Sequence, residues 1–191
     1  MNGTQPVSRR TLHVRALVEG AIFVALSQIL SYIKVFDALQ GGAVTAASML
    51  PVVVFALRWG PAWGFGGAFV YGMLQYVLGD GFHAINWQSL VGDYLVAFGV
   101  LGVAGFFKGF KWGIFFAMPA AGAARFLVHF VVGATVWAEY MPPDFSSPWL
   151  YSLFYNGAYM LPDTLIAVAL AALAYKPLRK YFMGQDIPAQ R

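Results

Sequence analysis

Cysteine is absent from the 191 residues of this sequence, and charged residues make up only 10% of them. The absence of cysteine excludes disulfide bonds, thiolate metal sites and a thiol nucleophile. Soluble domains carry about 25% charged residues, whereas this chain is 60% hydrophobic and has a mean hydropathy of +0.65. The composition therefore predicts an all-α membrane protein that crosses the bilayer several times.

The sequence also lacks the short motifs that accompany several kinds of chemistry. Residues Gly105–Gly109 include a lysine but no Gly-Lys-Ser/Thr triplet, which argues against a Walker A site for ATP. The three histidines, His13, His83 and His129, form no paired metal-binding motif. We therefore predict no catalytic residue, no metal site and no cofactor, and we do not expect the chain to be an enzyme.

Six apolar stretches are candidates for spanning helices, because a span needs roughly 20 mostly apolar residues, or fewer inside a bundle. A turn signal, Arg58-Trp59-Gly60-Pro61, separates the short second and third stretches. No long linker interrupts the chain, so we predict one integral membrane domain over 1–191, with short cytoplasmic tails at 1–14 and 176–191. The predicted helices are 16–36, 43–57, 63–78, 90–107, 113–138 and 153–175.

Most basic residues fall at places that a six-helix topology puts on one side of the membrane. Positively charged loops remain in the cytoplasm, so both termini are predicted to be inside. We interpret the basic tails as an anchor against anionic membrane lipid rather than as a surface for nucleic acid. The opposite loops carry Asp37, Asp80, Glu139 and Asp144. The basic residues that follow the pattern are Arg9, Arg10, Arg15, Arg58, Lys108, Lys111, Lys176, Arg179, Lys180 and Arg191.

One face of the fifth predicted helix carries Arg125, His129, Gly133 and Trp137 at intervals of four residues. Gly133 is interpreted as a gap that leaves space for a flat ring. Charged groups inside a membrane cost several kcal/mol unless they are paired or hydrated, so they mark function by default. The predicted topology brings further side chains to the same outer layer, and we therefore predict a substrate site open to the extracellular side. These side chains are Asp93, Tyr94, Glu139, Tyr151 and Asn156.

Several of these residues also have a structural interpretation. Asp93 and Arg125 can pair with each other and hold two helices together, and His129 can be a hydrogen-bonded core residue. Trp137 can belong to the interfacial aromatic belt of membrane proteins. Asp163 lies deeper and is interpreted as a structural partner for backbone groups or for Arg125. Both interpretations of each residue stay open at the level of the sequence.

Small residues recur at intervals of four in the first predicted helix, as Ala16 with Gly20 and, one residue further on, Ala21 with Ala25. Such faces allow another helix to approach closely. The partner is either a helix of this bundle or a separate membrane protein.

Long motifs near the end of the chain resemble those of a known family. The first joins Arg125, His129-Phe130, Gly133 and Trp137-Ala138-Glu139-Tyr140 to Pro142. The second is Ser147-Pro148-Trp149-Leu150-Tyr151-Ser152-Leu153, then Tyr155-Asn156-Gly157 and Tyr159-Met160-Leu161-Pro162. Asp93-Tyr94 and Gly41-Gly42 with Met49-Leu50-Pro51 add support. From Arg15 to Tyr175 the chain resembles the thiamine-specific substrate-binding subunits, or S components, of energy-coupling factor (ECF) transporters.

The resemblance implies a six-helix S component in a bacterial cell membrane. Such a subunit captures thiamine from outside and works with a module of one transmembrane coupling protein and two ATPases, which hydrolyse the ATP. Ala21 and Ala25 match the family's docking positions for that module. The matching ligand residues are Asp93, Tyr94, Arg125, His129, Trp137, Tyr151 and Asn156, while Glu139 is a second candidate counter-charge for the thiazolium. The family's aromatic gate has only Phe36 as a counterpart in the first outer loop.

Three other functions are compatible with the sequence. A stand-alone carrier for thiamine or another cation would be driven by protons through Asp93 and His129. A related S component would bind a different vitamin. An intramembrane enzyme would use His129 with an acid, although no nucleophile or metal set accompanies this histidine.

Overall fold

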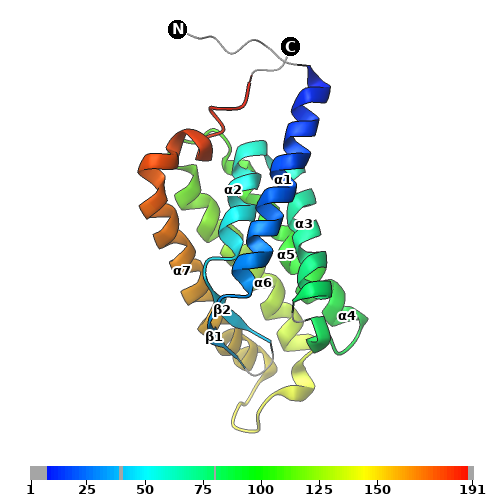
Figure 1. Ribbon diagram of the computed structural model, residues 1–191. Helices are drawn as coiled ribbons and strands as arrows, with labels where there is room; N and C mark the ends of the chain where they lie inside the picture. Colours follow the sequence, from blue (N-terminus) through cyan, green and yellow to red (C-terminus); the bar gives the residue numbers. More distant parts are fainter. Residues whose placement is uncertain (1–7, 39–40, 80, 189–191) are drawn as a thin grey trace.

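A computed structural model describes residues 8–38, 41–79 and 81–188 of the chain. The described residues form an elongated helical bundle in which α1 begins and α7 finishes at one end, here called the terminal end (Figure 1). The hairpin and the connection between α6 and α7 lie at the opposite end, the loop end. In chain order the elements are α1 (Arg9–Ser31), β1 (Lys34–Asp37), β2 (Ala43–Thr45), α2 (Met49–Trp59), α3 (Pro61–Leu78), η1 (Gly81–His83), α4 (Trp87–Ser89), η2 (Leu90–Val96), α5 (Ala97–Gly99), η3 (Val100–Phe107), α6 (Gly113–Thr135), η4 (Ala138–Tyr140) and α7 (Pro148–Phe182).

Four helical stretches among the described residues are long and apolar enough to cross a membrane, namely Arg9–Ser31, Trp87–Phe107, Gly113–Thr135 and Pro148–Phe182. Between them, α2 is a shorter apolar helix and α3 has 18 residues. The prediction of an all-α membrane protein is confirmed to the extent that most of the described chain is helical and carries these apolar helices. A count of six spanning helices and cytoplasmic termini stay predictions.

The ends of the helices differ from the predicted ones where local signals decide them. α1 begins seven residues earlier than predicted, at Arg9 rather than 16, because the Ser8 side chain caps it by accepting a hydrogen bond from the Thr11 N–H. α6 ends at Thr135 rather than at 138. Two residues further on, the Trp137 N–H donates a hydrogen bond to the carbonyl of Val132 at 3.3 Å.

A two-stranded antiparallel hairpin replaces the predicted end of the first helix and start of the second. β1 pairs with β2 so that Lys34 lies opposite Thr45 and Phe36 opposite Val44. Val44 and Thr45 are β-branched and favour strands, and the connection includes Gly41 at φ +84°, a conformation that glycine adopts at little cost. The expectation of a purely helical fold is therefore wrong at the hairpin, which forms one wall of the site described below.

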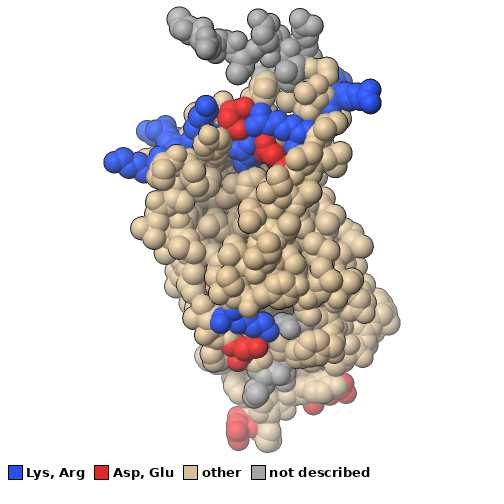
Figure 2. Space-filling view, in the orientation of Figure 1, with Lys and Arg blue, Asp and Glu red and all other residues tan. Residues whose placement is uncertain are grey.

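α2 is the central helix of the bundle. Every residue from 51 to 58 is buried in it, and α1, α3, η3, α6 and α7 all pack around it. Most of the large apolar residues that remain exposed lie on the helices around α2. Figure 2 shows a broad band without charged side chains between the two ends of the bundle, as expected of a surface that meets lipid.

The stretch from Trp87 to Phe107 is helical throughout but changes its winding. It passes from α4 into the π-helix η2 and, after α5, into the 3₁₀-helix η3. Glycines let it lie close to α3: a Cβ at Gly102 would lie 2.5 Å from the backbone of Phe65, and one at Gly72 would overlap the carbonyl of Tyr94. Single π-turns often occur at functional sites, and η2 carries Asp93 and Tyr94.

The two small-residue pairs of α1 point in different directions. Ala16 and Gly20 are buried, and a Cβ at Gly20 would lie 3.0 Å from the ring of Phe55 on α2. Ala21 and Ala25 are exposed on the opposite side of α1. Packing within the bundle thus accounts for the first pair, and only the second pair remains available to another protein.

Candidate functional site

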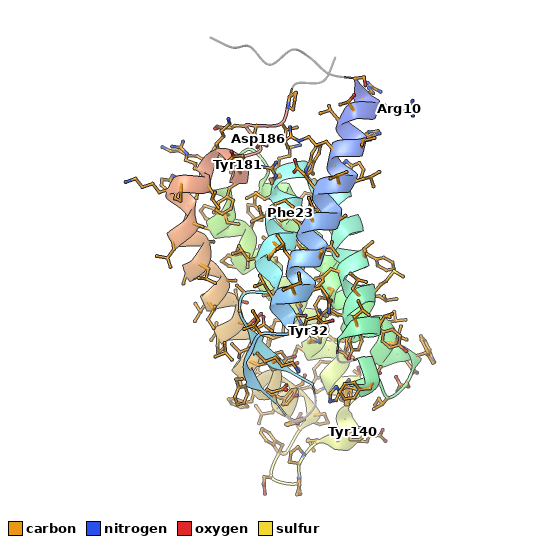
Figure 3. All side chains as sticks on the ribbon, viewed as in Figure 1. Arg10, Phe23, Tyr32, Tyr140, Tyr181 and Asp186 are labelled. Atoms are coloured by element: carbon orange, nitrogen blue, oxygen red, sulfur yellow. The ribbon has the colours of Figure 1, made fainter. Side chains whose placement is uncertain are left out.

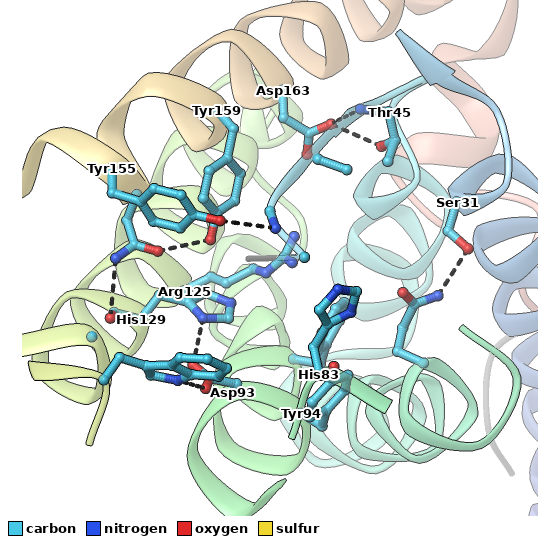
Figure 4. Close-up of a pocket in the computed structure, with 18 of the residues that line it drawn as sticks. Ser31, Thr45, His83, Asp93, Tyr94, Arg125, His129, Tyr155, Tyr159 and Asp163 are labelled. Atoms are coloured by element: carbon cyan, nitrogen blue, oxygen red, sulfur yellow. Dashed lines mark hydrogen bonds and ion pairs between the residues drawn. The ribbon is translucent and has the colours of Figure 1, made fainter. Parts of the chain in front are cut away.

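A cavity of about 110 Å³ lies between the hairpin and the helices toward the loop end (Figure 4). Residues of α1, α3, η1, η2, α5, α6 and α7 line it together with residues of the hairpin and Ser48, which precedes α2. Seven of the eight predicted ligand residues are among them: Asp93, Tyr94, Arg125, His129, Trp137, Tyr151 and Asn156. Glu139 belongs to η4 and does not line the cavity. Phe36, the suggested gate, is an exposed residue of β1 that does not line it either.

The Asp93 carboxylate connects η2 to α6 inside the cavity. Trp137 donates a hydrogen bond from its indole Nε1 to Oδ2 at 2.8 Å, and Nδ1 of His129 lies 2.9 Å from Oδ1. Gly92 permits this approach, because a Cβ there would lie 2.5 Å from Cγ2 of Val132 on α6. Both carboxylate oxygens are therefore held by aromatic rings that share the cavity.

The bond to Asp93 fixes the role of each His129 nitrogen. An ionised carboxylate only accepts hydrogen bonds, so Nδ1 carries the hydrogen and, in a neutral ring, Nε2 is an acceptor. Nε2 is buried and has no hydrogen-bond partner among the described residues. His129 therefore offers an acceptor to a ligand that reaches the cavity.

Arg125 does not pair with Asp93 in the described part of the chain. Its guanidinium carbon lies 4.2 Å from the ring centroid of Phe98, a cation–π contact, and its buried Nε finds no hydrogen-bond partner among the residues described. The interpretation of Asp93 and Arg125 as a helix-joining ion pair is therefore wrong. Arg125 instead places an incompletely satisfied donor beside the cavity.

Asn156 joins α6 to α7 through hydrogen bonds on both sides of its amide. Its Nδ2 donates to the carbonyl of His129 at 3.3 Å and to the hydroxyl and carbonyl oxygens of Ser152, both at 3.0 Å. Its Oδ1 accepts from the Tyr159 hydroxyl at 2.7 Å. The amide is thus occupied within the protein and positions the histidine-bearing turn of α6.

Gly133 serves close helix packing. A Cβ there would overlap the Ser152 hydroxyl and lie 3.0 Å from Nδ2 of Asn156. Ser152 in turn donates to the carbonyl of Phe130 at 2.7 Å. The gap expected beside the indole is therefore taken up by α7, although Gly133 still lines the cavity.

Asp163 fastens the hairpin to α7. Its Oδ1 accepts hydrogen bonds from the backbone N–H and the hydroxyl of Thr45, both at 2.8 Å, and Thr45 also contacts the Ser48 hydroxyl at 2.8 Å. This contact agrees with the interpretation of Asp163 as a partner for backbone groups.

Several lining residues escaped the sequence analysis because their neighbours in space are distant in the chain. They include Lys34 on β1, Gln75 on α3 and His83 on η1. Tyr159 closes the cavity against the hairpin, since a Cβ at Gly42 would lie 2.5 Å from its ring. The Gly42 N–H donates to the Tyr155 hydroxyl at 3.3 Å. The glycine pair before β2 was the only signal of this contact in the sequence.

Comparison with known proteins was made for the whole chain. Residues 17–183 match the family described as Thiamine transporter protein (Thia_YuaJ). The chain belongs to the thiamine transporter protein family. The family predicted from the motifs is thereby confirmed, and it is a family of transporters rather than enzymes.

Relatives of this thiamine transporter family support the assignment. The chain is 28% identical to thiamine transporter ThiT of Bacillus subtilis over 173 residues, which cover 83% of this chain and 89% of that protein. It is 26% identical to ThiT of Lacticaseibacillus paracasei over 188 residues, or 89% of this chain and 91% of the relative. A solved structure of ThiT from Listeria monocytogenes superposes with a TM-score of 0.77 at 23% identity, covering 89% and 98% of the two chains. That likeness establishes a shared fold.

Proposed function

We propose that this chain is the thiamine-binding S component of an ATP-driven ECF vitamin importer and captures thiamine in the cavity from the extracellular side. The observation that carries the proposal is the Asp93 carboxylate, held by His129 and Trp137 inside an aromatic cavity of a thiamine transporter family member.

The chemistry of the cavity suits the two rings of thiamine. The thiazolium ring is a fixed cation, for which Asp93 offers a counter-charge. The faces of the lining tyrosines and of Trp137 add cation–π attraction of roughly 0.5–2 kcal/mol. The flat aminopyrimidine carries an exocyclic amine, and the buried Nε2 of His129 is a matching acceptor. Tyr94 and Tyr151 complete the lining, whereas Asn156 acts by positioning His129.

The placement of the cavity supports capture from the extracellular side. Its walls include the hairpin and the last turn of α6, at the loop end, and lysines and arginines gather at the other end (Figure 2). Because positive segments stay in the cytoplasm, the loop end would face the extracellular medium.

Transport requires a partner that supplies energy. The exposed Ala21 and Ala25 lie on an α1 face that no other element of the described chain covers. Small side chains let a second helix approach closely, so this face would dock the transmembrane coupling protein, which carries two ATPases.

Tryptophan fluorescence tests substrate binding. Titration of the purified chain with thiamine is expected to give saturable quenching, and riboflavin and biotin are expected to give none. Trp137→Phe should abolish the quenching, whereas Trp87→Phe, at an exposed residue outside the cavity, should leave it. Absence of thiamine binding by calorimetry in a folded sample would refute the proposed substrate.

Reconstitution tests the energy source. Liposomes that contain the chain with its coupling protein and ATPases should accumulate thiamine only when ATP is supplied on the side of the membrane where the ATPases are bound. Accumulation by the chain alone under a pH gradient would instead identify a proton-driven carrier.

A further inference from the structure

A hydrogen-bonded group of polar side chains joins α1 to α3 at the side of the cavity. Nε2 of Gln75 donates to Oε1 of Gln28 at 2.8 Å and to Oγ of Ser31 at 2.9 Å. Ser31 itself donates to the backbone carbonyl of Gln28 at 2.7 Å. Gln28 and Ser31 are buried, at 5% and 8% exposure. Because polar side chains within a membrane are costly and mark function by default, this group is a candidate for a role in binding.

These bonds fix the direction of the Gln75 amide. The NH₂ group has two hydrogens and both are used, so Oε1 lies on the other side of the amide, where no described residue donates to it. Both Gln75 and Ser31 line the cavity. Nε2 of the buried Gln28 also lacks a partner among the described residues. The group therefore has more hydrogen-bonding capacity than the protein uses, and Gln75 offers an acceptor to the cavity.

A further hydrogen bond holds this side of the cavity in place. Tyr32 follows Ser31 directly and caps the end of α1, where Figure 3 shows it. Its hydroxyl donates to the carbonyl of Leu78, the last residue of α3, at 2.9 Å. Leu78 lies about one helical turn beyond Gln75. The Gln75 acceptor is therefore carried by two helices that are tied together, which makes its position well defined.

The acceptor lies across the cavity from the groups proposed to bind the aminopyrimidine. Figure 4 shows Ser31, the partner of Gln75, on the side opposite His129. Thiamine carries its polar groups at two ends, the aminopyrimidine at one and a hydroxyethyl group on the thiazolium at the other. With the amine at His129, the hydroxyethyl group points to the opposite side. Lys34, another cavity residue, is paired with Asp37 at 3.1 Å.

We propose that Gln75 is a specificity-determining residue that accepts a hydrogen bond from the hydroxyethyl group of thiamine, with Gln28 and Ser31 as positioning residues. The assignment rests on the proposed function, because it requires thiamine in the cavity. A hydroxyl group carries one donor, which Oε1 of Gln75 accepts. An ethyl group in its place leaves this acceptor unpaired in a closed site, and sites built around a substrate hydroxyl reject analogues that lack it for this reason.

Calorimetric titration of the whole purified chain with two ligands tests the proposal. The second ligand is the thiamine analogue in which ethyl replaces hydroxyethyl, so that the two differ only in the hydroxyl. The wild type should bind thiamine on the order of tenfold more tightly, the difference expected for one hydrogen bond. Equal affinities would overturn this inference and leave the proposed function standing, whereas failure to bind either ligand would overturn both.

Substitution of Gln75 locates the contact. Gln75→Met keeps the length of the side chain without the acceptor, so the affinity ratio of the two ligands should fall to about one through weaker binding of thiamine alone. A structural role would weaken both ligands equally, and an unchanged ratio would therefore overturn the proposal. Gln88→Met is the matched control, at an exposed residue of α4 outside the cavity, and should leave the ratio unchanged.

Ser31→Ala serves if Gln75→Met does not fold. It removes one of the two bonds that orient the Gln75 amide while the bond to Gln28 stays in place. The ratio should then fall part of the way toward one. A folded Ser31→Ala variant with the wild-type ratio would likewise overturn the proposal.

Discussion

Replacing Asp93 by asparagine removes one negative charge from the cavity at nearly constant volume. The carboxylate accepts hydrogen bonds from Trp137 at 2.8 Å and from His129 at 2.9 Å, and its side chain is 16% exposed. Asparagine keeps one acceptor oxygen but turns an NH₂ group toward the second donor. The loss of one charge-assisted hydrogen bond should lower the stability of the free protein by about 1.5–3 kcal/mol.

The effect on thiamine is separate and arises from the thiazolium charge. At a separation of about 5 Å and an effective dielectric constant of about 20, the Coulomb attraction between two unit charges is ~3 kcal/mol. Its loss corresponds to a dissociation constant raised by on the order of 100-fold. The free aminopyrimidine half of thiamine has no thiazolium, so its binding should weaken much less.

Calorimetric titration of the wild type and Asp93→Asn with both ligands measures this difference. Asp144→Asn is the matched control, because Asp144 is exposed in the connection between η4 and α7 and does not line the cavity. If Asp93→Asn weakens the neutral half as much as thiamine, the carboxylate only organises the cavity. If it weakens neither, the counter-charge reasoning is refuted.

Three further predictions concern packing and charge. Gly133→Ala should lower the melting temperature, because overpacking reduces the free energy of unfolding by about 1–3 kcal/mol. Adding Ser152→Gly to this variant should restore part of the loss. An unchanged melting temperature in Gly133→Ala would contradict the close helix contact. Asn156→Ala should destabilise the fold by about 1–3 kcal/mol because it leaves the Tyr159 hydroxyl unpartnered, and binding should fail together with stability; loss of binding in a fully stable variant would instead indicate a direct contact with thiamine. Burial raises the pKa of Asp186, but hydrogen bonds and charge from two arginines outweigh it and lower this pKa below its usual value. The ionised Asp186 therefore stabilises the folded state fully above about pH 4, and this contribution is lost as the pH falls through the lowered pKa. Thermal unfolding of Asp186→Asn between neutral and acid pH should therefore show a smaller acid loss than the wild type, and an equal loss would refute this role.

The placement of the ligand candidates was predictable from the sequence because helical periodicity and membrane thickness are strong constraints. An interval of four puts Arg125 and His129 on one face of α6 wherever that helix packs, and Trp137 follows directly after the end of the helix. The scarcity of charge then makes each intramembrane polar group a candidate. Asp93 was a candidate for this reason, and it lines the cavity together with its neighbour Tyr94.

The partners of these residues were not predictable, because periodicity fixes a face but not the helix that covers it. Arg125 and His129 lie one turn apart on α6, and only the π-winding of η2 and the close approach at Gly92 decide that Asp93 meets His129. The same holds for Gly133, which looks in sequence like space for a ligand and in the fold contacts Ser152.

The sequence by itself thus determined the membrane class, the family and seven of the residues that line the cavity, since these depend on composition, on motifs and on spacing along the helices. Only the tertiary structure decided the hairpin wall and the Asp93–His129–Trp137 network. Each of these depends on distances between segments far apart in the chain. Such distances follow from the packing of whole helices against α2. A single glycine or a change of helical winding there decides which side chains of two helices come into contact.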